Sequence, residues 1–237
     1  MKIAIITYDR PHRKTQDLVS RLKGHDITLG AIPWVERHST HEPLLNHRPS
    51  ECEQIIPQKL AKREGCDFHH YPLDRIDEIL AHIQPDKTII GGCGVVPIGV
   101  FTRNPTGEII NSHPGWLPNV RGLDAFKWTI YDNEPIGCTT YKISGDADTG
   151  WLIDRKETPI YRDDDFKSLA DRHYELEIDM LVEAVEKPVS DTYLGEKYIF
   201  QGYVPAYSVV HKRMPRDKEK LLPEILRHRV LHETVSA

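Results

Sequence analysis

The segment Lys2-Ile3-Ala4-Ile5-Ile6-Thr7 decides the fold class of this chain. Its apolar residues follow one another without polar alternation, which is typical of a strand buried on both faces in a parallel sheet. A polar turn over 9–14 comes next, and then a helical pattern that contains Leu18 and Leu22. A buried strand that leads into a helix predicts an α/β arrangement.

The alternation of strands and helices continues along the chain. Further strands are predicted over 27–32, 67–71, 87–90 and 108–111, with helices near 52–64 and 73–84 between them. The second half adds helices over 123–131, 166–185 and 221–231, and longer, partly antiparallel strands over 138–143 and 151–158. This order predicts a Rossmann-like, doubly wound and mostly parallel sheet.

The character of the sequence changes after Pro188, so we expect a main domain over 1–187 and a small C-terminal extension over 188–237. The extension is rich in tyrosine, and its aromatic residues exceed what a short solvated tail carries. We therefore expect it to contribute to a homodimer interface or to substrate contacts.

The composition excludes several classes of protein. The 237 residues carry a net charge of −5, which provides no basic excess for binding nucleic acid. The four cysteines have no C-x-x-C spacing, so they are expected to be reduced thiols rather than disulfides or zinc ligands. The apolar run at the N-terminus is too short for a signal peptide, and no segment has the length of a membrane span. We expect a soluble cytoplasmic protein.

Two polar motifs follow predicted strands. Asn111-Ser112-His113-Pro114-Gly115-Trp116-Leu117-Pro118 follows one strand, and Asp146-Ala147-Asp148-Thr149-Gly150 follows another. Functional groups in open α/β sheets gather just beyond the carboxyl ends of strands. A carboxamide, an imidazole and a carboxylate brought together there can manage the oxyanion and the protons of an acyl transfer without a covalent intermediate.

The pattern N-x-H-P-G-x-L-P-x-x-R-G followed by D-x-D-T-G resembles the folate-dependent formyltransferase family, whose members use 10-formyltetrahydrofolate to formylate an amine. The resemblance implies that Asn111 and His113 face the formyl oxygen. It also implies that Asp148 lies close to His113, favours its imidazolium form and relays protons through an ordered water. The structural alternative is that these are turn residues beside prolines and glycine.

The resemblance also implies a folate-contacting loop over 91–97, where glycine lets the backbone approach a flat ring. The residues assigned to folate are Gly92, Cys93, Gly94, Val95, Val96 and Asp146. Cys93 is interpreted as a small neutral filler. Asp146 is equally compatible with a solvated loop carboxylate, and the whole loop with a flexible turn. No metal is expected.

The acceptor amine is less clearly indicated. Family members that act on glycinamide ribonucleotide have a Gly- and Ser-rich phosphate loop after the first strand, whereas this chain lacks glycine over 7–14. In its place, Arg10, His12, Arg13 and Lys14 could bind a diphosphate, or could form a solvated basic turn. Members that formylate initiator tRNA carry a larger C-terminal domain and a basic surface, and members that hydrolyse the folate usually carry an N-terminal regulatory domain.

The remaining group of family members formylates a nucleotide-linked 4-amino-4,6-dideoxy sugar, with dTDP or GDP as the nucleotide, for surface polysaccharides such as the lipopolysaccharide O-antigen. We expect this chain to act on a substrate of that kind. Further candidate substrate contacts are Tyr8, Trp34, Arg37, Arg48 and Arg121. Trp34 or Tyr8 could stack on a base, and Arg121 could reach a phosphate or brace its own loop. The isomer of the bond to Pro118 and the role of loop 34–49, whose histidines alone do not make a zinc site, stay open.

Three alternative functions remain. The formyl group could be transferred to another small amine. Water could replace the amine, which would make the protein a hydrolase of the folate donor. The chain could also be a sugar-nucleotide or folate sensor without turnover. The sensor is disfavoured because it has no need of Asn111, His113 and Asp148 together.

Overall fold

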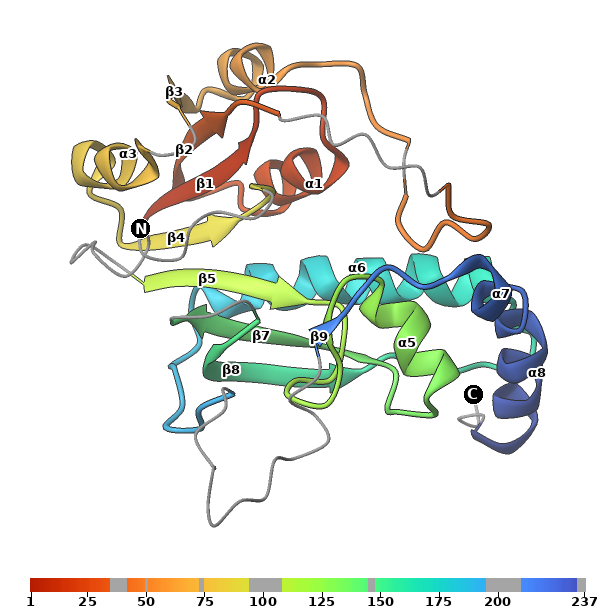
Figure 1. Cartoon of the computed structure of the whole chain (residues 1–237). Helices are drawn as coiled ribbons and strands as arrows, with labels where there is room; N and C mark the ends of the chain where they lie inside the picture. Colours follow the sequence, from red (N-terminus) through yellow and green to blue (C-terminus); the bar gives the residue numbers. More distant parts are fainter. Residues whose placement is uncertain are drawn as a thin grey trace.

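The centre of the molecule is a seven-stranded sheet with the order β3-β2-β1-β4-β5-β7-β8 (Figure 1). The computed structural model describes residues 1–34, 42–49, 51–72, 75–93, 108–144, 148–194 and 210–233. The parallel strands are β1 (Lys2–Tyr8), β2 (Asp26–Ile32), β3 (Asp67–His70), β4 (Lys87–Ile90) and β5 (Glu108–His113). β7 (Gly137–Ile143) pairs antiparallel with β5, and β8 (Gly150–Glu157) pairs antiparallel with β7. The predicted α/β, Rossmann-like and mostly parallel fold is confirmed.

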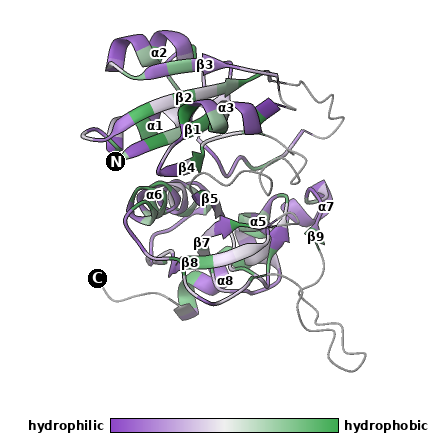
Figure 2. Cartoon of the chain, turned by 90° about the vertical axis from the view of Figure 1, so that its left-hand side faces the viewer, coloured by the Kyte–Doolittle hydropathy of each residue, from purple (hydrophilic) through white to green (hydrophobic). Residues whose placement is uncertain are grey.

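Helices cover both faces of the sheet, which explains the continuous apolar run of β1. Ile3 and Ile5 face a core with α1 (Arg13–Arg21), α2 (Pro57–Glu64) and α6 (Phe166–Ala184). Ala4 and Ile6 point the other way, toward α3 (Ile76–Ile83). Successive side chains of a strand alternate between faces, so a strand covered on both sides needs apolar residues at every position. Figure 2 shows hydrophobic residues along β1 and hydrophilic ones on the outside of α2.

The helix predicted near 52–64 begins later, at Pro57. Proline suits the first turn of a helix because its missing N–H has no partner there and its φ is already helical. The helix ends at Gly65, whose φ of 73° is the left-handed conformation that glycine adopts most easily.

The direction of the strand order reverses between β1 and β4. The chain leaves β1 for β2 and β3 on one side and returns to β4 on the other side of β1 (Figure 1). Such a reversal point, at the carboxyl ends of the strands, is where open α/β sheets bind their ligands. Gly91 and Gly92 follow β4 directly, and both donate their backbone N–H to the carbonyl oxygen of Ile6.

The C-terminal part packs against the main domain. Its elements are β9 (Val210–His211), α7 (Arg216–Glu219) and α8 (Leu222–Glu233), and β9 pairs with β6 (Arg121–Gly122). Leu222 and Leu226 of α8 share a core with Phe126 of α5 (Ala125–Tyr131) and with Phe166 of α6. The extension is therefore anchored at residues 210–233, and its role in a dimer stays a prediction.

The long helix α6 has a well-defined start. The Asp165 side chain accepts from the Ser168 N–H at 2.8 Å, and the Asp165 N–H donates to the Ser168 hydroxyl at 3.0 Å. This reciprocal capping satisfies backbone groups that a helix start leaves open. Among the helices in the described ranges, none has both the length and the apolar composition needed to cross a membrane.

Candidate active site

Asn111, His113 and Asp148 meet at the carboxyl end of β5. Asn111 and His113 lie two positions apart on one strand, so they share a face of the sheet. Asp148 stands between β7 and β8, and its Oδ1 lies 3.4 Å from His113 Nδ1. The fold therefore brings the three predicted groups together from the end of β5 and from the loop between β7 and β8.

Both ring nitrogens of His113 have partners. Nε2 lies 2.9 Å from the carbonyl oxygen of Val120, which can only accept, so Nε2 carries the hydrogen. Nδ1 faces the Asp148 carboxylate, whose Oδ1 lies 3.4 Å away. Neither nitrogen is open to a substrate oxygen in this conformation. The expectation that His113 faces the formyl oxygen would require it to exchange one of these partners.

Asp148 is held as an anion. Its Oδ2 accepts from the backbone N–H of Gly122 at 2.8 Å. Burial opposes ionisation, but the charge and hydrogen bond of His113, with the Gly122 N–H, lower the pKa of Asp148 to about 2. Its backbone is left-handed, with a φ of 53°, which costs about 1 kcal/mol for a residue other than glycine. Such strain is typical of functional sites.

Two glycines allow close packing in the loop that follows β5 and contains Gly122, the residue whose N–H binds Asp148. A Cβ at Gly122 would lie 2.2 Å from the carbonyl oxygen of His211, and its φ is 94°. A Cβ at Gly115 would lie 3.1 Å from the Cδ2 atom of His113. The bond between Leu117 and Pro118 is cis, which answers the question that the sequence left open. This loop thus supplies the two backbone groups that hold His113 and Asp148.

Tyr141 joins this site and was missed in the sequence. Asn111 Nδ2 donates to Tyr141 Oη at 3.0 Å, and Oη lies 3.5 Å from Asp148 Oδ1. Asn111 and Tyr141 are direct cross-strand partners in the antiparallel pair of β5 and β7. The strand pattern of β7 could have been read from the sequence, but its register against β5 could not, because register depends on both strands.

Part of the predicted folate loop lies where the strand order reverses between β1 and β4. A Cβ at Gly92 would lie 2.7 Å from the Tyr8 ring and 2.8 Å from the His12 ring, so a larger residue there would have to displace these rings. Burial raises the pKa of the Cys93 thiol to about 12, which agrees with a neutral filler. The other predicted folate contacts lie outside the described residues: Gly94, Val95, Val96 and Asp146.

Aromatic and cationic side chains gather at the ends of β1 and β2. The rings of Tyr8 and Trp34 meet edge to face with centroids 4.6 Å apart. The Arg10 guanidinium lies 3.7 Å from the Trp34 ring centroid, close enough for a cation–π contact. Trp34 is 38% exposed, so this aromatic platform, formed by Tyr8, Arg10 and Trp34, is accessible from solvent.

His12 and Lys14 do not present the free positive charge that the basic turn predicted. Burial, together with the charges of Lys14, Arg48 and Arg10, lowers the pKa of His12 to about 4, so its ring is neutral near pH 7. Lys14 is buried, and its Nζ donates at 2.9 Å both to Ser112 Oγ and to Glu177 Oε1. A diphosphate could bind Lys14 only by breaking this pair.

The remaining predicted cations have various partners. Arg48 donates to Glu177 Oε2 at 3.1 Å, and Arg13 donates to Asp17 at 2.7 Å. Arg121 is only 4% exposed, which agrees with bracing its loop. Arg37 lies outside the described residues.

Glu177 organises a second polar network that the sequence analysis also missed. Its carboxylate accepts from Ser112, Lys14 and Arg48. Burial opposes ionisation, but the two cations hold the pKa of Glu177 well below its usual range. The available signal was a carboxylate on the apolar face of the predicted helix over 166–185, where an unpaired charge would be costly.

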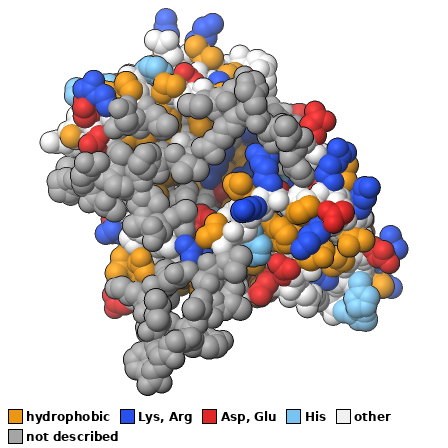
Figure 3. Space-filling view, viewed as in Figure 1, with side chains coloured by type: hydrophobic (Ala, Val, Ile, Leu, Met, Phe, Trp, Pro, Cys, Tyr) orange, Lys and Arg blue, Asp and Glu red, His pale blue; other side chains and the backbone are white. Residues whose placement is uncertain are grey.

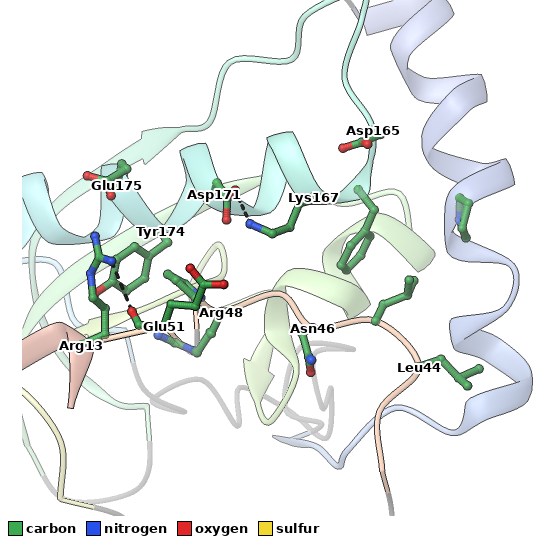
Figure 4. Close-up of a pocket in the computed structure, with 14 residues that line it drawn as sticks. Arg13, Leu44, Asn46, Arg48, Glu51, Asp165, Lys167, Asp171, Tyr174 and Glu175 are labelled. Atoms are coloured by element: carbon green, nitrogen blue, oxygen red, sulfur yellow. Dashed lines mark hydrogen bonds and ion pairs between the residues drawn. The ribbon is translucent and has the colours of Figure 1, made fainter. Parts of the chain in front are cut away.

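A cavity of about 800 Å³ lies elsewhere, between loop 44–51 and helices α1 and α6 (Figure 4). Arg13, Arg48, Lys167 and Tyr174 line it, and none of Asn111, His113 and Asp148 does. Lys167 is paired with Asp171 on its own helix. The cavity lies apart from Asn111, His113 and Asp148, so the volume of a cavity does not by itself identify the reactive site.

Comparison with known proteins supports the geometric interpretation. Residues 1–185 match the family model described as formyl transferase. The chain is 33% identical over 133 residues to a methionyl-tRNA formyltransferase of Trichlorobacter lovleyi, a match that covers 54% of this chain and only 42% of that protein.

Solved structures share the fold at low identity. A phosphoribosylglycinamide formyltransferase from Anaplasma phagocytophilum superposes with a TM-score of 0.58 at 18% identity, covering 78% of this chain and 85% of the other. A sugar N-formyltransferase from Shewanella sp FDAARGOS_354 gives 0.52 at 18% identity, covering 81% and 74%. These likenesses concern the fold, whereas the family match spans most of the chain. The chain belongs to the formyl transferase family.

Proposed function

We propose that this protein transfers a formyl group from 10-formyltetrahydrofolate to an amine. The observation that carries the proposal is the meeting of Asn111, His113 and Asp148 at the end of β5, in a chain of the formyl transferase family. The reversal point between β1 and β4 suits the folate, because glycine backbone follows β4 there and Gly92 carries no side chain.

Each residue has a distinct part in this proposal. The folate supplies the formyl group; the bond from its carbon to the folate nitrogen breaks as a bond to the amine nitrogen forms. Asn111 Nδ2 uses one hydrogen on Tyr141 and has a second for the oxygen on which negative charge develops. His113, once it exchanges one of its present partners, adds a second hydrogen bond to that oxygen. Asp148 accepts the proton that the amine loses, by way of water, and returns it by the same route to the departing folate nitrogen.

We further propose that the amine belongs to a nucleotide-linked 4-amino-4,6-dideoxy sugar. The aromatic platform lies at the carboxyl ends of β1 and β2, whereas Asn111 lies on β5. The order β2-β1-β4-β5 separates β2 from β5 by three strand spacings, or roughly 14 Å. A nucleotide sugar has the length to place its base on Trp34 and its amine at Asn111, with the diphosphate near Arg10. A smaller amine would leave the platform unused.

The charge distribution agrees with a small acceptor rather than a nucleic acid. The net charge is −5. Figure 3 shows Lys, Arg, Asp and Glu side chains intermixed on the described part of one face. A tRNA-binding surface would concentrate basic residues. A cytoplasmic location, a homodimer and a role in surface polysaccharide synthesis remain predictions that accompany this proposal.

The test is tetrahydrofolate release from 10-formyltetrahydrofolate with dTDP- and GDP-linked 4-amino-4,6-dideoxy sugars offered separately. Release that depends on one sugar, with a product heavier by one formyl group, would support the proposal. His228→Ala serves as a matched control for His113→Ala, since His228 lies on α8 away from the site. Only His113→Ala should lose activity.

Other outcomes would redirect the function. Release only with glycinamide ribonucleotide or initiator tRNA would replace the sugar as acceptor. Release without any amine would make the protein a hydrolase. Folate binding without release under any condition would favour a binding protein and contradict the catalytic proposal.

A further inference from the structure

We propose that Tyr141 is a positioning residue for formyl transfer, whose hydroxyl fixes the orientation of the Asn111 carboxamide and joins it to Asp148. This inference rests on the proposed function. The family match and the sequence motifs identify neither the residue nor the contact.

The fold places Tyr141 firmly. It stands opposite Asn111 across the antiparallel pair of β5 and β7, so both side chains lie on one face of the sheet. The register of β7 against β8 shifts between Thr140 and Tyr141, and such irregularities re-aim side chains beside functional sites. The ring is only 1% exposed and packs against Leu117 and Leu194.

Neighbouring backbone leaves the ring little freedom. A Cβ at Gly150 would lie 2.8 Å from the Tyr141 ring and 1.9 Å from the carbonyl oxygen of Lys142. Glycine at position 150 therefore lets the start of β8 close over the tyrosine. A ring enclosed in this way holds its hydroxyl at a fixed point between β5 and the Asp148 loop.

The hydroxyl resolves an ambiguity of the carboxamide. Asn111 can rotate by half a turn and present either its NH₂ group or its oxygen to the substrate. The Tyr141 oxygen accepts from Nδ2 at 3.0 Å, while its own hydrogen points toward Asp148 Oδ1 at 3.5 Å. The hydroxyl hydrogen is thus directed away from Asn111, which makes Oη an acceptor for the amide. The second N–H of Nδ2 then stays available for the developing oxyanion, which an amide oxygen would repel.

Tyr141 positions rather than transfers a proton. Burial and the neighbouring Asp148 charge raise the pKa of the phenol far above its ordinary value, so the hydroxyl keeps its hydrogen throughout the neutral range. Its effect on the reaction therefore passes through Asn111, and this gives the inference a specific signature.

The experiment compares Tyr141→Phe with Tyr174→Phe in the wild-type and Asn111→Ala backgrounds. Tyr174 is a matched control, because it is also buried and its hydroxyl also donates to an aspartate, Asp17, at 2.8 Å. Tyr141→Phe should lower kcat by about tenfold with KM values unchanged, the size expected for one lost hydrogen bond. Tyr174→Phe should leave kcat unchanged. In the Asn111→Ala background Tyr141→Phe should have no further effect.

Equal kcat values for Tyr141→Phe and Tyr174→Phe would overturn the inference. So would a tenfold loss that persists in the Asn111→Ala background, since Tyr141 would then act independently of Asn111. Absence of formyl transfer by the wild type with every acceptor would overturn the proposed function and this inference together. Transfer by the wild type with no Tyr141 effect would overturn this inference alone.

Discussion

The two faces of β5 carry polar groups that differ in how tightly they are paired and in how far they are exposed to solvent. On one face, Asn111 and His113 form a cluster with Asp148, whose Oδ1 lies 3.4 Å from His113 Nδ1 and 3.5 Å from the hydroxyl of Tyr141. On the other face, Ser112 joins the Lys14 and Glu177 pair, whose contact measures 2.9 Å. The Glu177 side chain is 1% exposed, whereas Asp148 is 19% exposed. Adjacent residues of one strand thus serve different purposes.

The difference shows how a stabilising network can be told from a reactive one. The Glu177 carboxylate is fully used by three donors and shielded from water, so it holds α1, β5, α6 and the loop with Arg48 together. The Asn111 cluster keeps one amide hydrogen in reserve and partial access to solvent. We expect changes on the Glu177 face to reduce stability and changes on the Asn111 face to reduce turnover.

The largest effect is expected for Glu177→Ala. Removing this carboxylate leaves Lys14 as a buried cation with only the Ser112 hydroxyl as partner, a defect that typically costs about 3–5 kcal/mol. Chemical denaturation of the variant and the wild type measures the change. Glu175→Ala, on the same helix but with a half-exposed side chain that pairs with Arg21, provides the control. A Glu177→Ala protein as stable as this control would show that the network is not structural.

Asn111→Ala should have the next largest effect, and it should fall on activity. Loss of one donor to a developing oxyanion lowers kcat by about 10²–10³-fold. Because Asn111 is only half-buried, the free energy of unfolding should change little. Steady-state kinetics and denaturation of the same preparation test both halves of this expectation. A variant that unfolds readily but, once folded, turns over normally would reverse the roles of the two faces.

The acid stability of the protein should report the state of Asp148. Its folded pKa of about 2 lies below the ordinary value of 3.8, so the ionised form stabilises the fold above about pH 4. That contribution, about 2 kcal/mol by the size of the shift, is lost as the pH falls from about 4 toward 2. Denaturation across this range should give a smaller loss for Asp148→Asn than for the wild type. An equal loss of unfolding free energy in the two proteins would show that the ionised form of Asp148 does not stabilise the fold.

Trp34→Ala should weaken acceptor binding and leave the folate site intact. Loss of stacking is worth about 0.5–1.5 kcal/mol, which raises the KM for the nucleotide sugar up to about tenfold. The KM for 10-formyltetrahydrofolate should not change. If the KM values for the sugar and for the folate rise together, Trp34 contributes to the folate site as well as to acceptor binding.

The smallest effect is expected away from β5. Lys167 and Asp171 form an exposed pair one turn apart on α6. Asp171→Asn should change the free energy of unfolding by less than about 0.5 kcal/mol, because solvent screens such pairs. A larger change, measured by the same denaturation assay, would mean that surface charge contributes more to this fold than the comparison of the two faces assumes.

Much of the fold could be predicted from local patterns. The run Ile3 to Ile6 predicted a strand buried on both faces, and the alternation that follows it predicted the parallel sheet. The start of α2 at Pro57 was missed because the helical pattern extends before the proline. Patterns of this kind depend on neighbouring residues, so they can be recognised without the fold.

The parts of the site that were not predicted depend on residues far apart in the sequence. Tyr141 meets Asn111 through a strand register, and Lys14 meets Glu177 from a helix 163 positions away. Neither spacing leaves a local pattern. The basic composition of the turn over 9–14 was likewise visible in the sequence. The sequence did not show that burial would keep His12 neutral or that Lys14 would pair with Glu177.

The measurement that tests the central claim most directly is tetrahydrofolate release by the wild type and by Asn111→Ala, with and without the nucleotide-linked amino sugar. If the Asn111 face of β5 carries the chemistry, release by the wild type will require the sugar, and the variant will be slower by about 100-fold or more while remaining folded. Sugar-dependent release at the same rate in both proteins would contradict the assignment of this face.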